Sequence, residues 1–410
     1  MAKPTLALIP ASQGSKLFSV LPSSGVGDFD FSRGSAATRI NSQGLIENVV
    51  SGQSRLSYPL IDGKVVGCPH HILEPARTNL VTYSEDFSNP NWTKLGAGTG
   101  SAAIVTSDYA ISPDGTQNAT RLQCDLNGGL TSSANQSLIY DSYTSSGNQS
   151  ISIYVKSNTG SNQTIYFANT QTSGDTITVT SDWQRFEFSH STATYIFAIG
   201  LRGRSGGSID DTADILIYGA QAEQASYPTS YIPTNGAAVT RSAETANGSG
   251  DATTFNDSEG VLMFESSGLT EVGTNQSIAI SDGSISNRIL FRYNSTNQIR
   301  VIVISGSVFV FDKLLNISSI EEYNKFVIKY KQNDFALWVN GFELGTDNSG
   351  VTPAGLSELA LDDGSGINDF YGNTKQIQYY NSALTDSELE QLTSWISFTD
   401  MANGQLYTIE

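Results

Sequence analysis

The chain has 410 residues, too many for one ordinary core and suited to two or three domains of about 100–200 residues each. Charged residues make up only 15% of it, against a usual value of about 25%, and uncharged Ser, Thr, Asn, Gln and Gly are correspondingly frequent. This composition favours short strands and turns over helices. Lys and Arg number 22 against 40 Asp and Glu, so the net charge is −18. No basic block occurs, which argues against nucleic-acid and membrane-surface partners.

The start of the chain and the cysteines bear on the cellular compartment. The apolar stretch at residues 6–9 is too short for a signal-peptide core and lies between Pro4 and Pro10. No run approaches the length of a membrane span. We therefore expect synthesis in a cytoplasm, no Sec export and no membrane insertion. Cys68 and Cys124 are too few for a disulfide framework or a four-ligand zinc site.

Residues 1–79 differ from the rest of the chain. Gly and Pro recur every few residues and no period is sustained, which predicts short strands tied by turns. Such a segment packs either onto its own downstream module or onto a neighbouring subunit. We expect a neighbour to cover its apolar side chains, since leaving them wet costs roughly 25 cal/mol per Å². These side chains are Phe18, Phe29, Phe31, Leu45 and Ile46.

Residues 80–234 carry an all-β pattern. Apolar and polar residues alternate at 150–156, 163–167, 183–188, 195–201 and 214–219, with Asn, Gly, Ser and Thr turns between them. Short alternating strands with frequent turns predict an antiparallel sandwich or jelly roll. The Asn- and Gly-rich residues 235–250 that follow predict a linker or a surface crossing.

Residues 251–410 predict a second antiparallel sandwich. Further strand-like runs occur here, and the Asn340-Gly341 pair after one of them is a strong hairpin signal. One short helix is expected at 385–393, with Thr385 as N-cap and Glu388 completing a capping box. The predicted fold class is therefore all-β: an irregular N-terminal segment, two antiparallel sandwiches and one short C-terminal helix.

Several motifs resemble segments of known proteins. FDFSRGSAATR at 29–39, GLIE at 44–47, and Cys68-Pro69 with LEPARTNL at 73–80 resemble the N-terminal segment of many bacteriophage tail and fibre proteins. YSEDF at 83–87 with Trp92, and YGAQAE at 218–223 with YIPT at 231–234 and Arg241, resemble the opening and close of the module that usually follows. In those proteins that module is a jelly roll similar to carbohydrate-binding modules. LWVNG at 337–341, FYG at 370–372 and YYNSALTDSEL at 379–389 resemble a concanavalin-like, laminin-G-type sandwich.

The resemblance implies a structural protein of a bacteriophage virion, a tail fibre or a head fibre that attaches to the host. It implies other virion proteins as partners, assembly as a homotrimer, and a host surface glycan as ligand. One alternative keeps the virion but lets the sandwiches decorate or brace capsid or tail without a ligand. Another is a bacterial surface adhesin or a glycan-processing enzyme, which the absence of a signal peptide disfavours.

Binding a sugar in such a sandwich requires an exposed aromatic platform with hydrogen-bonding side chains around it. Trp183 and Trp338 lie inside strand-like runs and are expected in the core. The aromatic residues near turns are the candidates for a ligand platform: Trp92, Tyr109, Tyr140 and Tyr143.

Metal binding and catalysis leave weaker signals. Structural calcium would need clustered oxygen ligands on a loop, and Asp210, Asp211 and Asp214 form one such group. A second group contains Asp362, Asp363 and Asp369. The histidines, His70, His71 and His190, belong to no recognisable triad or zinc motif, so we expect no enzymatic activity and no cofactor beyond such calcium.

Overall fold

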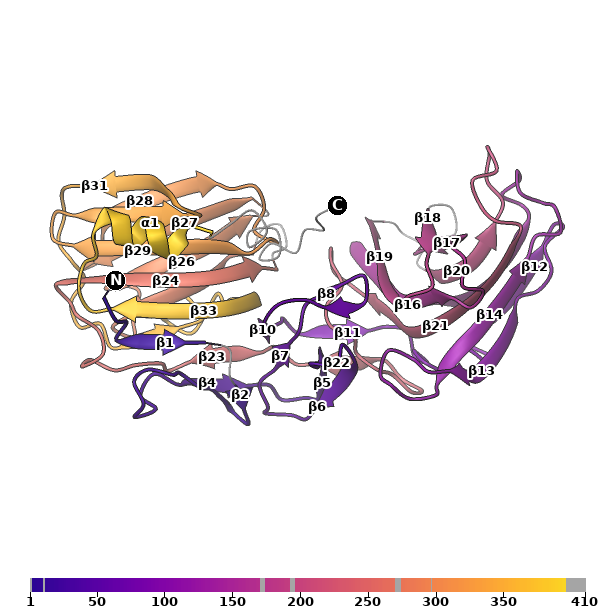
Figure 1. The fold of residues 1–410 in the computed structure, drawn as a ribbon, viewed down its shortest axis with the longest axis horizontal. Helices are drawn as coiled ribbons and strands as arrows, with labels where there is room; N and C mark the ends of the chain where they lie inside the picture. Colours follow the sequence, from indigo (N-terminus) through magenta and orange to yellow (C-terminus); the bar gives the residue numbers. More distant parts are fainter. Residues whose placement is uncertain are drawn as a thin grey trace.

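The protein is described from a computed structural model that covers residues 2–9, 12–169, 174–191, 196–269, 274–295 and 297–395. Strands hold 49% of the residues and helix 2%, which confirms the all-β class. Two β-sandwiches form the lobes of an elongated molecule, and strands from the N-terminal segment run along one side between them (Figure 1). No described helix has the length and apolar character needed to cross a membrane.

The first sandwich packs two five-stranded antiparallel sheets against each other. One sheet has the order β12 (Thr93–Ala97), β15 (Gln136–Ser142), β20 (Ile196–Arg202), β17 (Gln163–Ala168) and β18 (Asp175–Val179). The other has the order β13 (Ile104–Ala110), β14 (Ala119–Asp125), β21 (Thr212–Glu223), β16 (Asn148–Ser157) and β19 (Gln184–Ser191). The alternation seen in the sequence places Ile151, Ile153 and Val155 of β16 in the core between the sheets.

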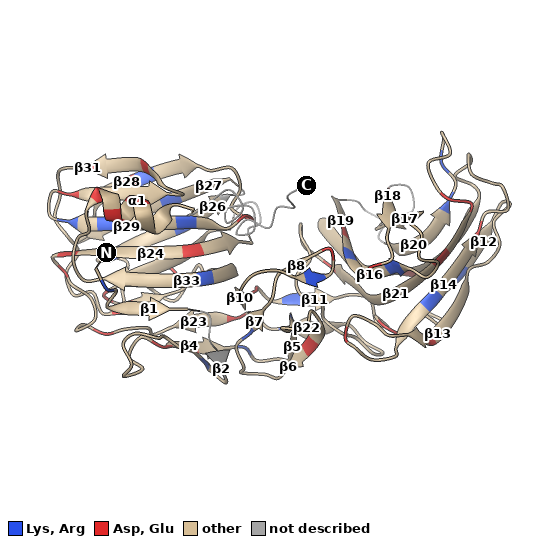
Figure 2. Ribbon diagram, in the orientation of Figure 1, with Lys and Arg blue, Asp and Glu red and all other residues tan. Residues whose placement is uncertain are grey.

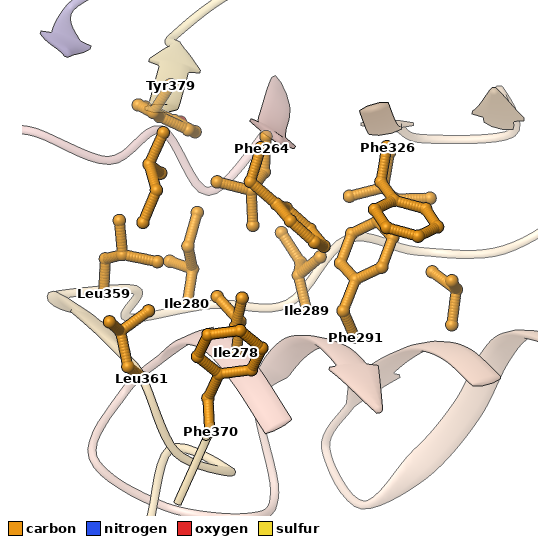
Figure 3. Packing of buried hydrophobic residues seen from close by; sticks show 14 of the residues in the cluster. Phe264, Ile278, Ile280, Ile289, Phe291, Phe326, Leu359, Leu361, Phe370 and Tyr379 are labelled. Carbon is orange, nitrogen blue, oxygen red and sulfur yellow. The ribbon is translucent and has the colours of Figure 1, made fainter. Parts of the chain in front are cut away.

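The second sandwich draws strands from both ends of the chain. Its larger sheet has the order β31 (Phe342–Asp347), β30 (Phe335–Val339), β29 (Asn324–Lys331), β24 (Glu259–Gly268), β33 (Gly372–Tyr380), β10 (His70–Leu73) and β7 (Leu56–Ser57), and β1 (Leu6–Leu8) also pairs with β33. The facing sheet has the order β28 (Val308–Asn316), β27 (Gln298–Ser305), β26 (Arg288–Ser295), β25 (Gln276–Ser281) and β32 (Glu358–Ala360). Aromatic rings fill the space between them (Figure 3). The rings of Phe264 and Phe291 pack edge-on with their centroids 4.4 Å apart, and the Phe264 ring also contacts Phe326.

The predicted C-terminal helix is confirmed as α1 (Asp386–Thr393). Thr385 accepts a hydrogen bond from the Glu388 backbone N–H, and the Glu388 side chain accepts one from the Thr385 N–H, so the capping box is complete. Leu389 buries the helix against the outer face of the larger sheet beside Trp338. Trp338 is thereby buried, as expected from the sequence.

The N-terminal segment consists of short strands that the chain's own modules cover. These strands are β2 (Ser12–Gln13), β3 (Lys16–Leu17), β4 (Phe29–Ser32), β5 (Ala37–Ile40), β6 (Ile46–Val49), β8 (Leu60–Ile61) and β9 (Lys64–Val65). Phe29 and Phe31 belong to the core of the second sandwich, and Ile46 packs beside Tyr154 of the first. The expectation that a neighbouring subunit covers these side chains is therefore wrong, and of the named set only Phe18 is classed as exposed, at 37%.

The predicted linker, residues 235–250, is a structured crossing. β22 (Val239–Arg241) pairs with β11 (Arg77–Asn79), and β23 (Thr245–Asn247) pairs with β4. Two of its charged side chains, Arg241 and Glu244, are buried to 1% and 0% exposure. The prediction of a surface crossing agrees with residues 235–240, which are exposed, and fails for the part that contains Arg241 and Glu244, because these charges find partners inside the protein.

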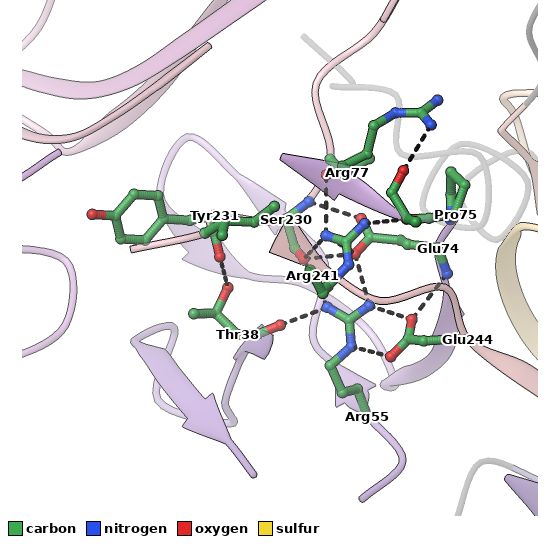
Figure 4. Close-up of polar contacts among 12 residues, drawn as sticks. Thr38, Arg55, Glu74, Pro75, Arg77, Ser230, Tyr231, Arg241 and Glu244 are labelled. Atoms are coloured by element: carbon green, nitrogen blue, oxygen red, sulfur yellow. Dashed lines mark hydrogen bonds and ion pairs between the residues drawn. The ribbon is translucent and has the colours of Figure 1, made fainter. Parts of the chain in front are cut away.

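Those partners form a buried ion cluster of three arginines and two glutamates: Arg33, Arg55, Arg241, Glu74 and Glu244. Arg55 lies at its centre, paired with both glutamates; its Nη2 is 2.7 Å from Glu74 Oε2 and its Nε 2.8 Å from Glu244 Oε1 (Figure 4). Arg33 donates to Glu244 at 2.7 Å, and Arg241 contacts Glu74 at 2.9 Å. All five side chains are at most 5% exposed.

Backbone groups complete the cluster and link it to both lobes. Arg55 Nη1 donates to Thr38 O at 2.7 Å, and Arg241 Nη2 donates to Pro75 O at 2.7 Å. Glu74 accepts from the Ser230 N–H at 2.7 Å, at the end of the first sandwich (Figure 4). Burial acts to raise the pKa of Glu74, but Arg241 and Arg55 hold that pKa well below its usual range. The carboxylate therefore stays charged and paired.

We predict that Glu244→Gln lowers the free energy of unfolding by about 3–5 kcal/mol, because it leaves two buried guanidinium groups without their shared carboxylate. Denaturant unfolding of the full chain measures this. The matched control is Glu47→Gln, which breaks the partly exposed Arg39–Glu47 pair and should cost no more than about 1 kcal/mol. Equal effects of the two substitutions would contradict the structural role of the cluster.

Acid should destabilise the fold through His70 and His71, which are buried on β10 between β7 and β33. Burial lowers the pKa of His70 to about 3, with Lys375 and His71 contributing, and lowers that of His71 to about 4. Because both folded pKa values lie below the unfolded value, the unfolded chain binds more protons below pH 6.5, and stability falls as the pH falls. Between pH 7 and pH 4 each histidine should remove about 3 kcal/mol.

The thermal unfolding temperature measured across that pH range tests this prediction. A double variant, His70→Gln with His71→Gln, should unfold with a smaller pH dependence between about 4 and 6.5 than the natural chain, whatever its stability at pH 7. An unchanged slope would show that other groups govern the acid response.

Candidate functional site

The candidate site lies on the outer face of the sheet that contains β12, β15, β20, β17 and β18. On β15, Ile139 points into the sandwich core, whereas Gln136, Leu138 and Tyr140 stand on the opposite face. On β20, Ile196, Ala198 and Arg202 share that outer face. Together with Leu95 and Tyr166 these side chains line a hollow of about 230 Å³. An outer face this rich in apolar and aromatic residues is unusual for a strand exposed to water.

A second hollow of about 390 Å³ adjoins the first and shares Tyr166 and Arg202 with it. Its other lining residues are Ser133, Gly174, Gly203, Arg204 and Ser205. We call the two hollows together the sheet groove. Its floor is apolar around Leu138 and Ala198, and its wall carries the aromatic and basic side chains.

Arginines hold the Tyr166 ring in place. The Arg202 and Arg204 guanidinium groups lie 5.6 and 6.0 Å from the ring centroid. Arg202 also donates from Nη1 to Tyr166 Oη at 3.2 Å. Tyr166 is only 3% exposed, so Tyr140, which is half-buried, offers the more accessible ring of the groove.

Two glycines shape the groove. Gly200 pairs with both Leu138 and Tyr166 and has φ +144°, and a Cβ there would lie 2.6 Å from Leu138 Cα. No side chain therefore stands between these two residues, and the hollow stays open at that point. A Cβ on Gly174 would lie 2.6 Å from a carbon of the Tyr166 ring, so only glycine lets this loop approach the ring.

The arrangement combines an aromatic ring, an apolar floor, an amide at Gln136 and guanidinium groups at one end. Pyranose rings present C–H faces that pack on aromatic and apolar surface and hydroxyls that bind amides and guanidinium groups. In the part of the chain that the structure describes, no Asp or Glu lines either hollow. Asp141 directly follows Tyr140 but points to the other face of the sheet, where burial raises its pKa to about 6.

The structure separates the four predicted platform residues. Tyr140 lines the sheet groove, and Tyr143 is half-buried against the core of the same sandwich. Tyr109 lies on the other sheet, 42% exposed, with the Arg121 guanidinium 4.9 Å from its ring centroid. Trp92 is only 1% exposed, so its assignment as an exposed platform is wrong.

Trp92 is buried because the turn before β12 folds back onto the core. Its ring packs 4.9 Å from Phe87 and 5.5 Å from Phe197, and its Nε1 donates to Tyr83 O at 2.9 Å. Trp183, expected in the core, is instead half-buried beside the N-terminal hairpins, where Nε1 donates to Ile111 O at 3.2 Å. Nearness to a turn and position in a strand-like run were poor guides to burial in these two cases.

The aspartates of the first predicted calcium group make hydrogen bonds and an ion pair within the protein. Asp210 accepts from the Thr164 N–H and Asp211 from the Gly128 N–H, both at 2.8 Å, while Asp214 pairs with Arg121 at 2.6 Å. The hydrogen bond from Arg121 lowers the pKa of Asp214. Across the described residues, no three His, Cys, Asp or Glu side chains converge as metal ligands, so Asp210, Asp211 and Asp214 do not gather into one carboxylate cluster; calcium binding itself stays a prediction.

The same finding covers the second aspartate group. Asp362 accepts from the Gly364 N–H at 2.6 Å, and Asp363 pairs with Arg288 at 3.4 Å. Asp369 accepts from Tyr371 Oη at 3.4 Å. These carboxylates stabilise a turn, which is the usual role of Asp in such loops.

An acidic hollow of about 480 Å³ also lies on the first sandwich, lined by Glu85, Asp86 and Asp108. Glu85 accepts hydrogen bonds from Tyr231 Oη at 2.8 Å and Tyr218 Oη at 3.1 Å. This hollow and the sheet groove therefore differ in charge, the first negative and the second positive.

No protein-family model matches the chain, and no curated protein matches it. Solved structures are similar over about a third of it. The CBM40 of a Ruminococcus gnavus IT-sialidase, bound to α2,3-sialyllactose, has 16% identity and a TM-score of 0.30, and the match covers 35% of this chain and 92% of that one. Domain 4 of a GH43 extracellular arabinanase from Geobacillus stearothermophilus, in complex with arabinotriose, has 14% identity and a TM-score of 0.30, covering 37% and 73%. The Bacillus licheniformis β-glucanase has 15% identity and a TM-score of 0.26, covering 34% and 72%. None of these similarities assigns a ligand to the present chain.

Proposed function

We propose that this chain is a glycan-binding appendage protein of a bacteriophage virion, a tail fibre or a head fibre, and that the sheet groove contacts the glycan. The observation that carries the binding part is the hollow of about 230 Å³ beside the half-buried Tyr140 ring, with an apolar floor and with Gln136 and Arg202 as polar neighbours. A strand facing only water would gain nothing from these residues.

The virion part rests on the motifs at 29–39 and 73–80, which resemble the N-terminal segment of phage fibre proteins. Both motifs contribute to the buried ion cluster, through Arg33 and Glu74. A chain whose two sandwiches are tied together in this way suits an appendage that must transmit force without unfolding. We place the protein in the virion, after synthesis in the host cytoplasm and release by lysis.

Assembly as a homotrimer with other virion proteins is part of the same proposal. The apolar residues of the N-terminal segment are mostly buried within the chain, so the contact would use other surfaces. Exposed apolar side chains are present on the neighbouring edge strands β28 and β31, where Val308, Phe309 and Phe342 are 62%, 56% and 70% exposed. Edge strands of this kind are common sites of association between subunits.

We predict that purified protein binds a host surface polysaccharide and that Tyr140→Ala weakens this binding at least about tenfold, through loss of ring stacking. A glycan array followed by calorimetry measures it. Tyr109→Ala removes a more exposed tyrosine ring from the other sheet and should leave the affinity unchanged. Folded protein that binds no glycan at all would favour the alternative in which the sandwiches only brace the particle.

We further propose that the protein is not an enzyme. Glycoside hydrolysis requires two carboxyl groups flanking the scissile bond, and the described residues that line the groove include none. Incubation with the polysaccharide that binds should release no reducing sugar above the rate of a buffer blank. Turnover that disappears when a single carboxylate is changed to its amide would overturn this proposal.

A further inference from the structure

The sheet groove is a positively charged spot on a negatively charged protein. Of the described residues, those that line it include Arg202 and Arg204 and no acidic residue, although the whole chain carries a net charge of −18. Elsewhere Lys and Arg are scattered over strands of both lobes (Figure 2). Because the acidic hollow on the same sandwich shows the opposite balance, the charge of the groove does not follow from the composition of this lobe.

Arg204 is positioned by the fold and faces no acidic partner. Its Nη1 donates to Gly174 O at 2.9 Å, its backbone N–H donates to Leu130 O at 2.7 Å, and its guanidinium lies against the Tyr166 ring. Among the described residues no carboxylate lies within ion-pair distance of it. A guanidinium has five N–H donors in a planar fork, and here one hydrogen bond to the protein fixes it while other donors remain for a ligand.

We propose that the ligand of the sheet groove is an acidic glycan, whose carboxylate pairs with Arg204 while the attached sugar lies along the apolar floor toward Tyr140. This inference rests on the proposed function and specifies its ligand class. The guanidinium fork matches a carboxylate in a two-point hydrogen bond. Arg202, at the boundary of both hollows, adds a second positive charge within the same groove.

A neutral sugar would displace water from the Arg204 guanidinium without supplying a counter-charge. Removing water from an unpaired charge costs free energy and would weaken binding. A long polyanion would be repelled by the net charge of −18 beyond the groove. The arrangement therefore favours a glycan with one carboxylate-bearing unit bound at the Arg204 end. Its charge is recognised only through direct contact with the groove.

The test compares each acidic oligosaccharide with its own methyl ester, which keeps the rings and removes the charge. The probes are sialyllactose and trigalacturonic acid, so that a sialic-acid source and a uronic-acid source of the carboxylate are distinguished. Calorimetry on the full chain should show at least one acid binding tenfold or more tightly than its ester. Arg204→Gln should lower the affinity for that acid to the level of the ester and leave the affinity for the ester unchanged.

Two further variants distinguish loss of the ion pair with the ligand from a change in the fold of the protein. Arg204→Lys keeps the charge but loses the fork, and it should retain part of the preference for the acid. Arg300→Gln makes the same charge change in the second sandwich, at a partly exposed pair with Asp312, and should alter neither affinity. Thermal unfolding of each variant confirms that it is folded.

Equal affinity for acid and ester would overturn the inference while leaving glycan binding intact. So would an Arg204→Gln variant that weakens acid and ester alike, since that result indicates a structural role for the arginine. Folded natural protein that binds none of these probes and no neutral glycan on an array would overturn the inference and the proposed function together.

Discussion

The buried ion cluster is the constraint on which the arrangement of the molecule depends. Arg55 contacts Glu74 and Glu244, which are far apart in the sequence, and through them it joins the N-terminal segment to the crossing between the sandwiches. Burying charges is costly unless each finds a partner, so the cluster forms only when all its segments are in place. Both lobes are thereby held to one small region, and Ser230 ties the end of the first sandwich to it.

This constraint explains features that otherwise look unrelated. The N-terminal segment lacks a core of its own because its strands complete the second sandwich, where β1, β7 and β10 extend the larger sheet. The motifs that resemble phage fibre proteins supply Arg33, Glu74 and Arg241, so the resemblance marks residues that organise the fold. The outer sheet face of the first sandwich takes no part in this packing, which leaves it available to a ligand.

The sequence predicted several of the strands from runs of apolar and β-branched residues, although it missed β14, whose burial alternates. The runs at 163–167 and 195–201 correspond to β17 and β20, and the capping box correctly located α1. β15 was not among the predicted strands; its Leu138, Ile139 and Tyr140 are successive apolar residues, of which one faces the core and two line the groove. A strand with apolar residues on both faces was thus the available signal of a site.

Other features depend on contacts that no local pattern encodes. The ion cluster joins residues up to 211 positions apart, as between Arg33 and Glu244. The sequence around each residue gives no signal that predicts this pair. Arg202 and Arg204 lie against the Tyr166 ring, which belongs to a different strand, so their place in the site could not be predicted from the residues around them in the sequence. Trp92 was misplaced for the same reason, since Phe197, which covers it, lies far along the chain.

The most direct test of this account is an experimental structure of the full chain with an acidic oligosaccharide bound at saturating concentration. The account predicts the oligosaccharide in the sheet groove, with the carboxylate of its acidic unit within hydrogen-bond distance of the Arg204 guanidinium and its other units extending toward Tyr140. Sugar bound in the acidic hollow beside Glu85 or on the second sandwich, with the groove empty, would contradict it.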